Sequence, residues 1–257
     1  GIFMVVLIQN LGFNPLLYGV IAFVPRLVDA ITDPLMGFIS DNTKSKWGKR
    51  RQYVFIGAIL TGLSFIAMWQ LYSQNGIVFN FWYFLVLSLA FYLGITIFSI
   101  PFVAMGYEMS SDFHERTRIM AISQFIGQFA WVVAPWIWVI IYNPDLFESP
   151  ESATRQLAVI IGIACTIFAL TPALFINSKS TLDDNNLIPL TTENIGKSFK
   201  NIFVIFGDAF KNIPFRKLCI ATFLIFNSFQ TIAAFSFFII VYYLFNGDAG
   251  AAGVWPT

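Results

Sequence analysis

Residues 26–37 read RLVDAITDPLMG and lie near the end of an apolar run that is long enough to cross a lipid bilayer. The stretch contains two carboxylates, Asp29 and Asp33, and one arginine, Arg26. Each such group at the centre of a membrane helix costs roughly 2.5–3.5 kcal/mol on insertion scales. Because residues four apart share one face of a helix, the two carboxylates point the same way, with the arginine one turn before them. We therefore expect this face to line a polar cavity or to hold an ion.

Pro34 follows the second carboxylate directly and removes the helical hydrogen bond to the carbonyl of Ala30. That carbonyl and the Thr32 hydroxyl would add neutral oxygens beside the two anionic ones. Hard cations prefer oxygen ligands, and transporters bind them where a membrane helix is locally unwound. The stretch is therefore predicted to bind a monovalent cation through Asp29 and Asp33. The alternative is a structural ion pair with the arginine, which would leave Asp33 without a counterion.

The composition indicates a membrane protein. Of the 257 residues, 57% are hydrophobic and only 11% are charged, whereas soluble domains have about 25% charged residues. Apolar runs of about 20 residues predict successive spans, so the expected fold class is an all-α membrane protein. The net charge of +1 gives no reason to expect a nucleic-acid partner. Cys165 and Cys219 lie in apolar runs and are expected to be packing residues.

The apolar runs predict seven helices that cross the membrane. The first would be truncated at residue 1, and the others are expected at residues 16–40, 52–72, 77–105, 118–142, 156–176 and 215–245. Residues 195–213 alternate apolar and lysine-bearing faces at helical spacing, which predicts an amphipathic helix in the membrane interface. We expect three units: an N-terminal half of six helices (1–176), a central loop (177–214), and the start of a C-terminal half (215–257). The chain would then be a fragment of a two-halved transporter.

The basic residues predict the orientation of these spans. Thirteen of the 15 Lys and Arg residues lie in the alternate loops 41–51, 106–118 and 177–217. Basic loops stay on the cytoplasmic side of a membrane. We therefore expect a multi-pass protein of the bacterial inner membrane with the loops 41–51, 106–117 and 177–214 in the cytoplasm.

Three stretches resemble a known family. The loop that begins at Asp41 and ends with GKRR at 48–51 resembles the loop that latches helix ends in the major facilitator superfamily. Residues 29–37 (DAITDPLMG) and 100–118 (IPFVAMGYEMSSDFHERTR) are similar to signatures of its glycoside–pentoside–hexuronide:cation symporter family, the family of melibiose permease. The resemblance covers essentially the whole chain. It implies a monomeric transporter, not an enzyme, that imports a sugar or glycoside by alternating access and is coupled to sodium or protons.

The resemblance also implies roles for individual residues. The cation site would comprise Asp29, Thr32, Asp33 and Thr96, a threonine on the fourth span. On the sugar side the family's aspartate, tryptophan and arginine are replaced by Ser99, Val103 and Gln124, so the resemblance does not specify the sugar. The expected substrate pathway comprises Arg26, Ser99, Val103, Gln124 and Gln128. The expected cytoplasmic gate, held by ion pairs, comprises Asp41, Gly48, Lys49, Arg50, Glu108, Asp112, Glu115 and Arg116.

Two rival functions share some of these features. Intramembrane aspartyl proteases also need two membrane aspartates, but they place them on separate helices that face one another, whereas Asp29 and Asp33 share one helix. A nearer rival keeps the fold and carries lysolipids with sodium, which the many aromatic residues would allow. No cofactor is expected beyond the coupling ion, sodium or a proton.

Overall fold

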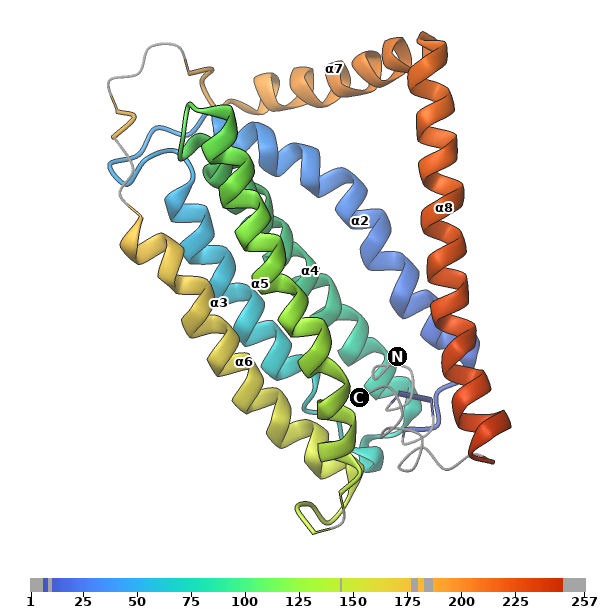
Figure 1. The fold of residues 1–257 in the computed structure, drawn as a ribbon. Helices are drawn as coiled ribbons and strands as arrows, with labels where there is room; N and C mark the ends of the chain where they lie inside the picture. Colours follow the sequence, from blue (N-terminus) through green and yellow to red (C-terminus); the bar gives the residue numbers. More distant parts are fainter. Residues whose placement is uncertain (1–6, 9–10, 144, 177–179, 183–186, 247–257) are drawn as a thin grey trace.

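The computed structural model describes residues 7–8, 11–143, 145–176, 180–182 and 187–246, and this part of the chain contains helices and no strand. Figure 1 shows the main helices, which are α2 (Pro15–Asp41), α3 (Arg51–Met68), α4 (Ile77–Glu108), α5 (Phe113–Ile141), α6 (Pro150–Phe175), α7 (Thr192–Lys211) and α8 (Ile213–Phe238). A short helix, η2 (Ser73–Asn75), follows α3, and a π-helix, η3 (Ile239–Leu244), extends α8. Among the described helices, α2, α3, α4 and α6 are long and apolar enough to cross a membrane. The prediction of an all-α membrane protein is confirmed.

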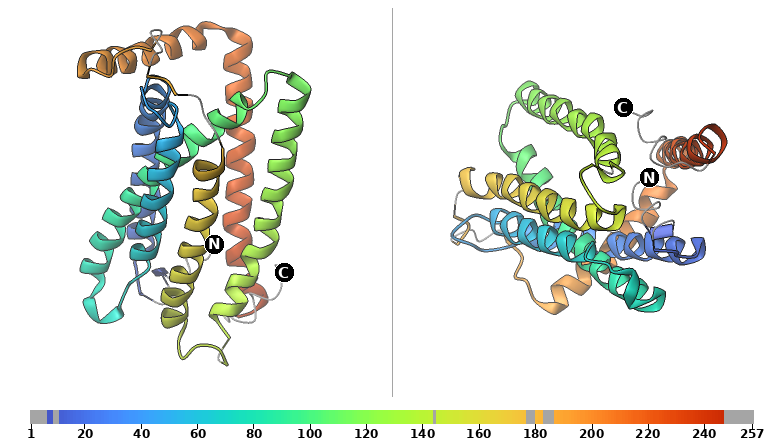
Figure 2. Two further views of the ribbon diagram at one scale, coloured as in Figure 1. Left: turned by 90° about the vertical axis from the view of Figure 1, so that its left-hand side faces the viewer. Right: turned by 90° about the horizontal axis from the view of Figure 1, so that it is seen from below.

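The helices are arranged around α3 and α4. Helix α3 packs against both α4 and α6, and α2 packs on α4. Figure 2 shows α5 and α8 standing outside this group, while α7 lies across one end of the molecule. The predicted start of the first helix falls mostly on residues outside the described part of the chain.

The outer surface of the helices is apolar. On α2, the side chains of Leu27 and Ile31 are each 53% exposed, and they lie on the side of the helix opposite Asp29. Similar large apolar side chains are exposed along α4, α5, α6 and α8. A surface of this kind is costly in water and suits contact with lipid.

Some helices begin earlier than the sequence predicted, because polar residues cap them. Helix α5 begins at Phe113 instead of residue 118, since the Asp112 carboxylate accepts a hydrogen bond from the backbone N–H of His114 at 2.7 Å. Helix α6 begins at Pro150 instead of residue 156, after the Ser149 cap. The earlier start of α5 shortens the basic loop 106–117, and Figure 1 shows this loop and the basic loop 41–51 at the same end of the molecule as α7.

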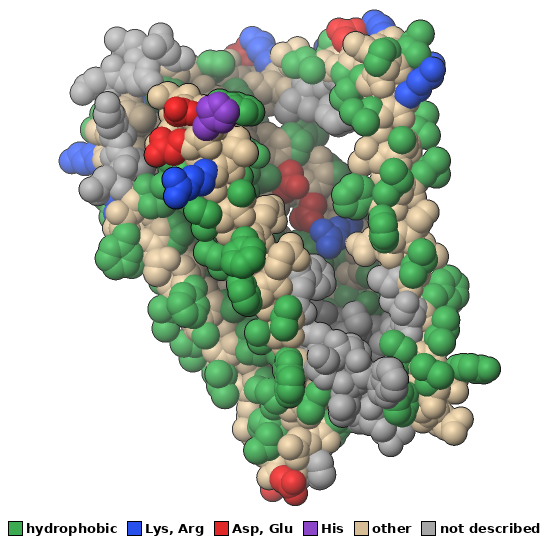
Figure 3. All heavy atoms as spheres, viewed as in Figure 1, with side chains coloured by type: hydrophobic (Ala, Val, Ile, Leu, Met, Phe, Trp, Pro, Cys, Tyr) green, Lys and Arg blue, Asp and Glu red, His purple; other side chains and the backbone are tan. Residues whose placement is uncertain are grey.

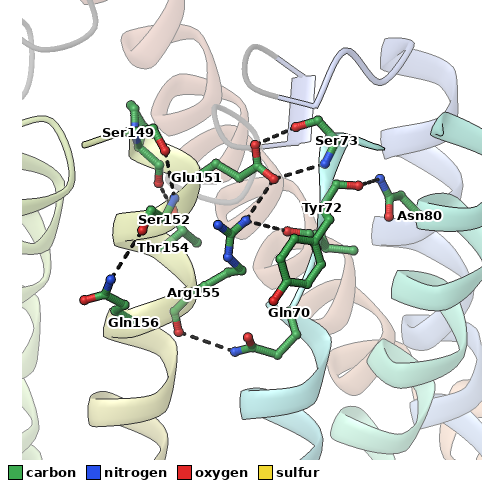
Figure 4. Close-up of polar contacts among 12 residues, drawn as sticks. Gln70, Tyr72, Ser73, Asn80, Ser149, Glu151, Ser152, Thr154, Arg155 and Gln156 are labelled. Atoms are coloured by element: carbon green, nitrogen blue, oxygen red, sulfur yellow. Dashed lines mark hydrogen bonds and ion pairs between the residues drawn. The ribbon is translucent and has the colours of Figure 1, made fainter. Parts of the chain in front are cut away.

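A polar cluster joins α3 to α6 at the opposite end of the molecule (Figure 4). The Glu151 carboxylate accepts hydrogen bonds from the backbone N–H of Ser73 at 3.0 Å and from its hydroxyl at 2.5 Å. The Arg155 guanidinium donates to Glu151 and to the carbonyl of Leu71, both at 2.9 Å, and lies over the Tyr72 ring at 4.4 Å. The start of α6 is therefore fixed to the turn after α3.

Glycines allow α3 and α4 to approach one another closely. A Cβ atom at Gly57 on α3 would lie 2.5 Å from the backbone nitrogen of Phe98 on α4. A Cβ atom at Gly94 on α4 would lie 2.8 Å from the backbone nitrogen of Thr61 on α3. Between membrane helices small residues replace the hydrophobic effect as the basis of packing, because close backbones gain van der Waals contact.

We expect the variant Gly57→Ala to lower the free energy of unfolding by roughly 1–3 kcal/mol, since the added methyl group meets backbone atoms that cannot rotate away. Gly19→Ala on α2 is the matched control, because a Cβ atom there meets nothing within 4 Å and alanine favours the helix. Thermal unfolding in detergent, followed by circular dichroism, measures both. Equal stability of the two variants would contradict the close contact between α3 and α4.

Candidate functional site

The contact between α2 and α4 contains a partly buried hydrogen bond between the two helices that carry the predicted cation-site residues. The Thr96 hydroxyl on α4 donates to Asp33 Oδ1 on α2 at 2.7 Å. Thr96 is only 2% exposed, and Asp33 is partly buried. A hydroxyl that donates to a carboxylate forms a charge-assisted hydrogen bond, roughly twice as strong as a neutral one. The structure therefore brings these two predicted residues into direct contact across 63 positions of sequence.

Asp29 lies one turn earlier on the same helix and is less well satisfied. Its Oδ2 atom lies 3.7 Å from Arg26 Nη1, and its Oδ1 atom is buried with no hydrogen-bond partner in the described part of the chain. The Asp29 side chain is 17% exposed, whereas that of Arg26 is 68% exposed. A buried carboxylate oxygen without a donor is unfavourable, so this oxygen is suited to a ligand from outside the chain.

Arg26 has a second neighbour that the sequence did not single out. Its guanidinium carbon lies 5.0 Å from the centroid of the Tyr92 ring on α4, within the range of a cation–π interaction. Tyr92 precedes Thr96 by four residues, so both lie on one face of α4. That spacing was visible in the sequence, but only the packing of α4 on α2 reveals the contact.

Helix α2 is not unwound near Thr32 and Pro34, contrary to the expectation from the sequence. Thr32 donates to the carbonyl of Val28 on its own helix at 3.1 Å. Helix α2 runs without interruption from Pro15 to Asp41, although Pro25 and Pro34 lie inside it. The neutral oxygens beside the carboxylates therefore come from Thr96 on the neighbouring helix, and the predicted role of Thr32 stays a prediction.

The predicted substrate residues are only partly brought together. Val103 and Gln124 line one cavity of about 520 Å³ between α4, α5 and α6. Ser99 is partly buried and Gln128 is exposed, and neither belongs to the lining of this cavity. Arg26 lies beside Asp29 instead. The wall of the cavity is mostly apolar, and it includes Phe102 and Met105 among other residues.

Figure 3 shows where charged side chains occur on this face of the molecule. Acidic and basic side chains are visible inside a hollow between the front helix α5 and the separate helix α8, while the surrounding helices carry mostly apolar side chains. Other charged side chains on this face gather near the two ends of the molecule. Charged side chains therefore occur within this hollow as well as at the ends of the molecule.

Four of the predicted gate residues form a cluster, the charged latch, which consists of Asp41, Lys49, Arg50 and Glu108. Arg50 Nε donates to Asp41 Oδ1 at 3.1 Å, and Arg50 Nη1 forms an ion pair with Glu108 Oε2 at 2.6 Å that lacks hydrogen-bond geometry. Lys49 Nζ lies 3.0 Å from Glu108 Oε1. Gly48 has a φ of 84°, which favours glycine at the turn before α3. The latch joins the ends of α2, α3 and α4.

The other gate residues make local contacts instead of the expected ion pairs. Arg116 donates to the carbonyl of Ser110 at 3.1 Å, and the Ser110 hydroxyl bonds to Glu115. Asp112 caps α5, as described above. Within the described residues these three side chains take part in no ion pair, because the turn between α4 and α5 is short and its carbonyls and N–H groups lie nearer than the latch.

Sequence reasoning missed two further contacts at this end. Arg51 donates to the carbonyls of Ala173 and Leu174, the latter at 2.7 Å, and so holds the end of α6. The backbone N–H of Thr181 donates to the carbonyl of Ser45 at 3.1 Å, which fixes part of the central loop to the loop after α2. Backbone acceptors leave no signal in a sequence, so neither contact could have been predicted from residue types.

The geometry defines a helical membrane protein with a paired-carboxylate site and a charged latch, and comparison with known proteins agrees with it. The model of the family described as MFS/sugar transport protein matches residues 4–257. This chain therefore belongs to the sugar-transport family of the major facilitator superfamily. The resemblance inferred from the three sequence stretches is confirmed.

The chain is also similar to individual transporters. It is 28% identical to an uncharacterised symporter of Synechocystis over 65% of this chain and 32% of the relative. It is 29% identical to a lactose permease of Lactobacillus helveticus over 73% of this chain and 29% of the relative. It is 28% identical to a sodium-dependent lysophosphatidylcholine symporter of Xenopus tropicalis over 45% of this chain and 22% of the relative. The chain thus spans about a third or less of the length of these relatives.

We expect Thr96→Val to lower the free energy of unfolding by roughly 1.5–3 kcal/mol, because it leaves Asp33 Oδ1 without its charge-assisted donor while keeping the side-chain volume. Thr96→Ser retains the hydroxyl and is the matched control. Thermal unfolding in detergent measures the difference between the two variants. If the valine variant were as stable as the serine variant, the hydrogen bond between α2 and α4 would not hold the helices together.

Proposed function

We propose that the protein is part of a cation-coupled importer of a sugar or glycoside in the bacterial inner membrane, acting as a monomer by alternating access. The observation that carries the proposal is the pair of carboxylates on α2: Asp33 is held by Thr96, and Asp29 has one buried oxygen without a partner. Two membrane carboxylates on one helix face are expensive unless an ion or a proton joins them.

The pair of carboxylates supplies the coupling. Two carboxylates one helical turn apart repel each other when both are ionised, so one sodium ion or one proton between them is favoured. Binding would remove this repulsion and stabilise the α2–α4 contact, in which Thr96 already supplies a neutral hydroxyl. Thr32 lies between the carboxylates in sequence and would contribute its oxygen after a rotation away from the carbonyl of Val28.

The charged latch would act as the gate on the cytoplasmic side. Its ion pairs join α2, α3 and α4 at one end and must break and form again as the two halves of a transporter rock around a central site. The Arg50 side chain is 10% exposed, so its charge needs both acidic partners. The transport cycle would exchange these partners for others on the opposite half.

The substrate would bind beside α4 and α5 through neutral groups. Gln124 offers an amide to sugar hydroxyls, and Val103 forms part of the apolar wall of the same cavity. A sugar is favoured by the family and by the lactose permease among the relatives. A lysolipid is the second candidate, because the cavity wall is largely apolar and other relatives are named lysophosphatidylcholine symporters.

Asp29→Asn and Asp33→Asn should each abolish cation-dependent uptake, because each removes an anionic ligand while keeping its volume. The measurement is uptake into proteoliposomes that contain the whole transporter of which this chain is proposed to be a part, under an imposed sodium or proton gradient. Asp145→Asn, at an exposed loop position, is the matched control and should transport normally. Full cation-stimulated uptake by either α2 variant would remove that carboxylate from the site.

The substrate is tested by competition in the same vesicles. Labelled disaccharides and pentosides are offered beside labelled lysophosphatidylcholine, each with and without the cation gradient. Gradient-dependent accumulation of a sugar supports the proposal. Accumulation of the lysolipid alone would show that the substrate is a lysolipid and not a sugar. It would not contradict the proposed cation site.

Gln124→Leu should raise the KM for the sugar about two- to tenfold, which corresponds to the loss of one hydrogen bond. The half-saturating cation concentration should stay unchanged, since Gln124 lies on α5, away from Asp29 and Asp33. Gln156→Leu, on the exposed start of α6, is the control. An unchanged KM would show that the sugar does not reach the cavity that Gln124 lines.

A further inference from the structure

Arg26 lies over the Tyr92 ring but stays beyond hydrogen-bond distance of Asp29. Its Nη1 atom lies 3.7 Å from Asp29 Oδ2, whereas a direct charge-assisted hydrogen bond between such atoms is about 2.7–2.9 Å long. Its guanidinium carbon lies 5.0 Å from the centroid of the Tyr92 ring. The aromatic ring therefore holds the guanidinium at a point where the ion pair with Asp29 is incomplete.

The incomplete pair leaves Asp29 available to another ligand. Its Oδ1 atom is buried without a hydrogen-bond partner in the described part of the chain, and its Oδ2 atom faces Arg26 beyond hydrogen-bond distance. Arg26 is three residues away on the same helix, a spacing at which a direct pair forms readily. The Asp29 side chain is 17% exposed and that of Arg26 is 68% exposed, so water screens the attraction mainly from the side of the guanidinium. The contact of the guanidinium with the Tyr92 ring competes with closure of this pair.

We infer that Tyr92 is a positioning residue for Arg26: its ring keeps the guanidinium from closing on Asp29 and so keeps that carboxylate open to the coupling cation. The inference rests on the proposed function, because it assigns Tyr92 a part in the affinity of the same site. Tyr92 touches neither the cation nor the sugar in this role. It acts through Arg26 alone.

The position of Tyr92 explains how one helix serves both carboxylates. Tyr92 and Thr96 occupy successive turns on one face of α4. Thr96 donates a hydrogen bond to Asp33, while the Tyr92 ring holds the guanidinium of Arg26 beyond hydrogen-bond distance of Asp29. Without the ring, Arg26 would pair directly with Asp29, and an incoming sodium ion or proton would have to displace it. Because the guanidinium of Arg26 would first have to leave Asp29, the apparent affinity of the site for the sodium ion or proton would be lower.

The test compares Tyr92→Leu, Tyr92→Phe, Arg26→Gln and the double variant Arg26→Gln/Tyr92→Leu by cation binding to the purified protein in detergent. Sodium binding is followed by isothermal titration calorimetry with sodium chloride against choline chloride. Proton binding is followed by potentiometric titration in choline chloride. The control is Trp82→Leu, an exposed aromatic side chain elsewhere on α4.

We expect Tyr92→Leu to weaken cation binding about three- to tenfold, which matches the loss of one cation–π contact in a partly desolvated site. Tyr92→Phe keeps the aromatic face and should bind like the unmodified protein. In the Arg26→Gln background the additional change Tyr92→Leu should have no effect, because there is no guanidinium left to position. Unchanged or tighter binding by Tyr92→Leu would overturn the inference.

A purely structural role for Tyr92 gives a different result. The ring also packs on Phe91, with centroids 5.6 Å apart, and its loss could loosen α4. In that case Tyr92→Leu would weaken binding equally with and without Arg26, and this outcome would also overturn the inference. If the unmodified protein bound neither sodium nor protons at Asp29 and Asp33, the proposed function would fail together with the role of Tyr92.

Discussion

A carboxylate inside an apolar helix needs a partner, and this constraint fixes how α2 lies against α4. Asp33 takes its partner from α4, because the Thr96 hydroxyl is the donor at 2.7 Å. The same packing brings the Tyr92 ring next to Arg26. The opposite side of α2, with Leu27 and Ile31, is left to face lipid. If α2 were rotated about its axis, carboxylates would enter the lipid and apolar side chains would enter the hollow.

The polar contacts at the two ends of the molecule complement this central one. At the end of the molecule near α7, the latch and Arg51 join the ends of α2, α3, α4 and α6. At the other end, Glu151 and Arg155 fix the start of α6 to the turn after α3. Exposed ion pairs of this kind contribute little to stability. Within the described helices that are long and apolar enough to cross a membrane, Arg26, Asp29 and Asp33 on α2 are charges away from the helix ends, where a charge is costly and calls for a functional explanation.

The sequence was sufficient for the fold class and for the charged face of α2, because the apolar runs and the four-residue spacing of Asp29 and Asp33 are local patterns. Helix starts such as those of α5 and α6 were less accurate, since capping by Asp112 and Ser149 extends a helix beyond its apolar run. The contact of Arg26 with Tyr92 could not be predicted, because it depends on how two distant helices pack. The contact of Arg51 with backbone carbonyls of α6 could not be predicted either, because every residue has a backbone carbonyl.

Helix α4 connects the contact between Thr96 and Asp33 to the charged latch, because it contains both Thr96 and Glu108. Thr96 and Glu108 lie on the same helix, about 18 Å apart along its axis. The glycine contacts of α3 prevent this helix from sliding against its neighbour. Pro101 lies between the two residues and removes one backbone hydrogen bond, so the helix has a defined place at which it can flex. A movement of one part of α4 relative to the other would therefore change the direction of the helix at Pro101, between Thr96 and Glu108.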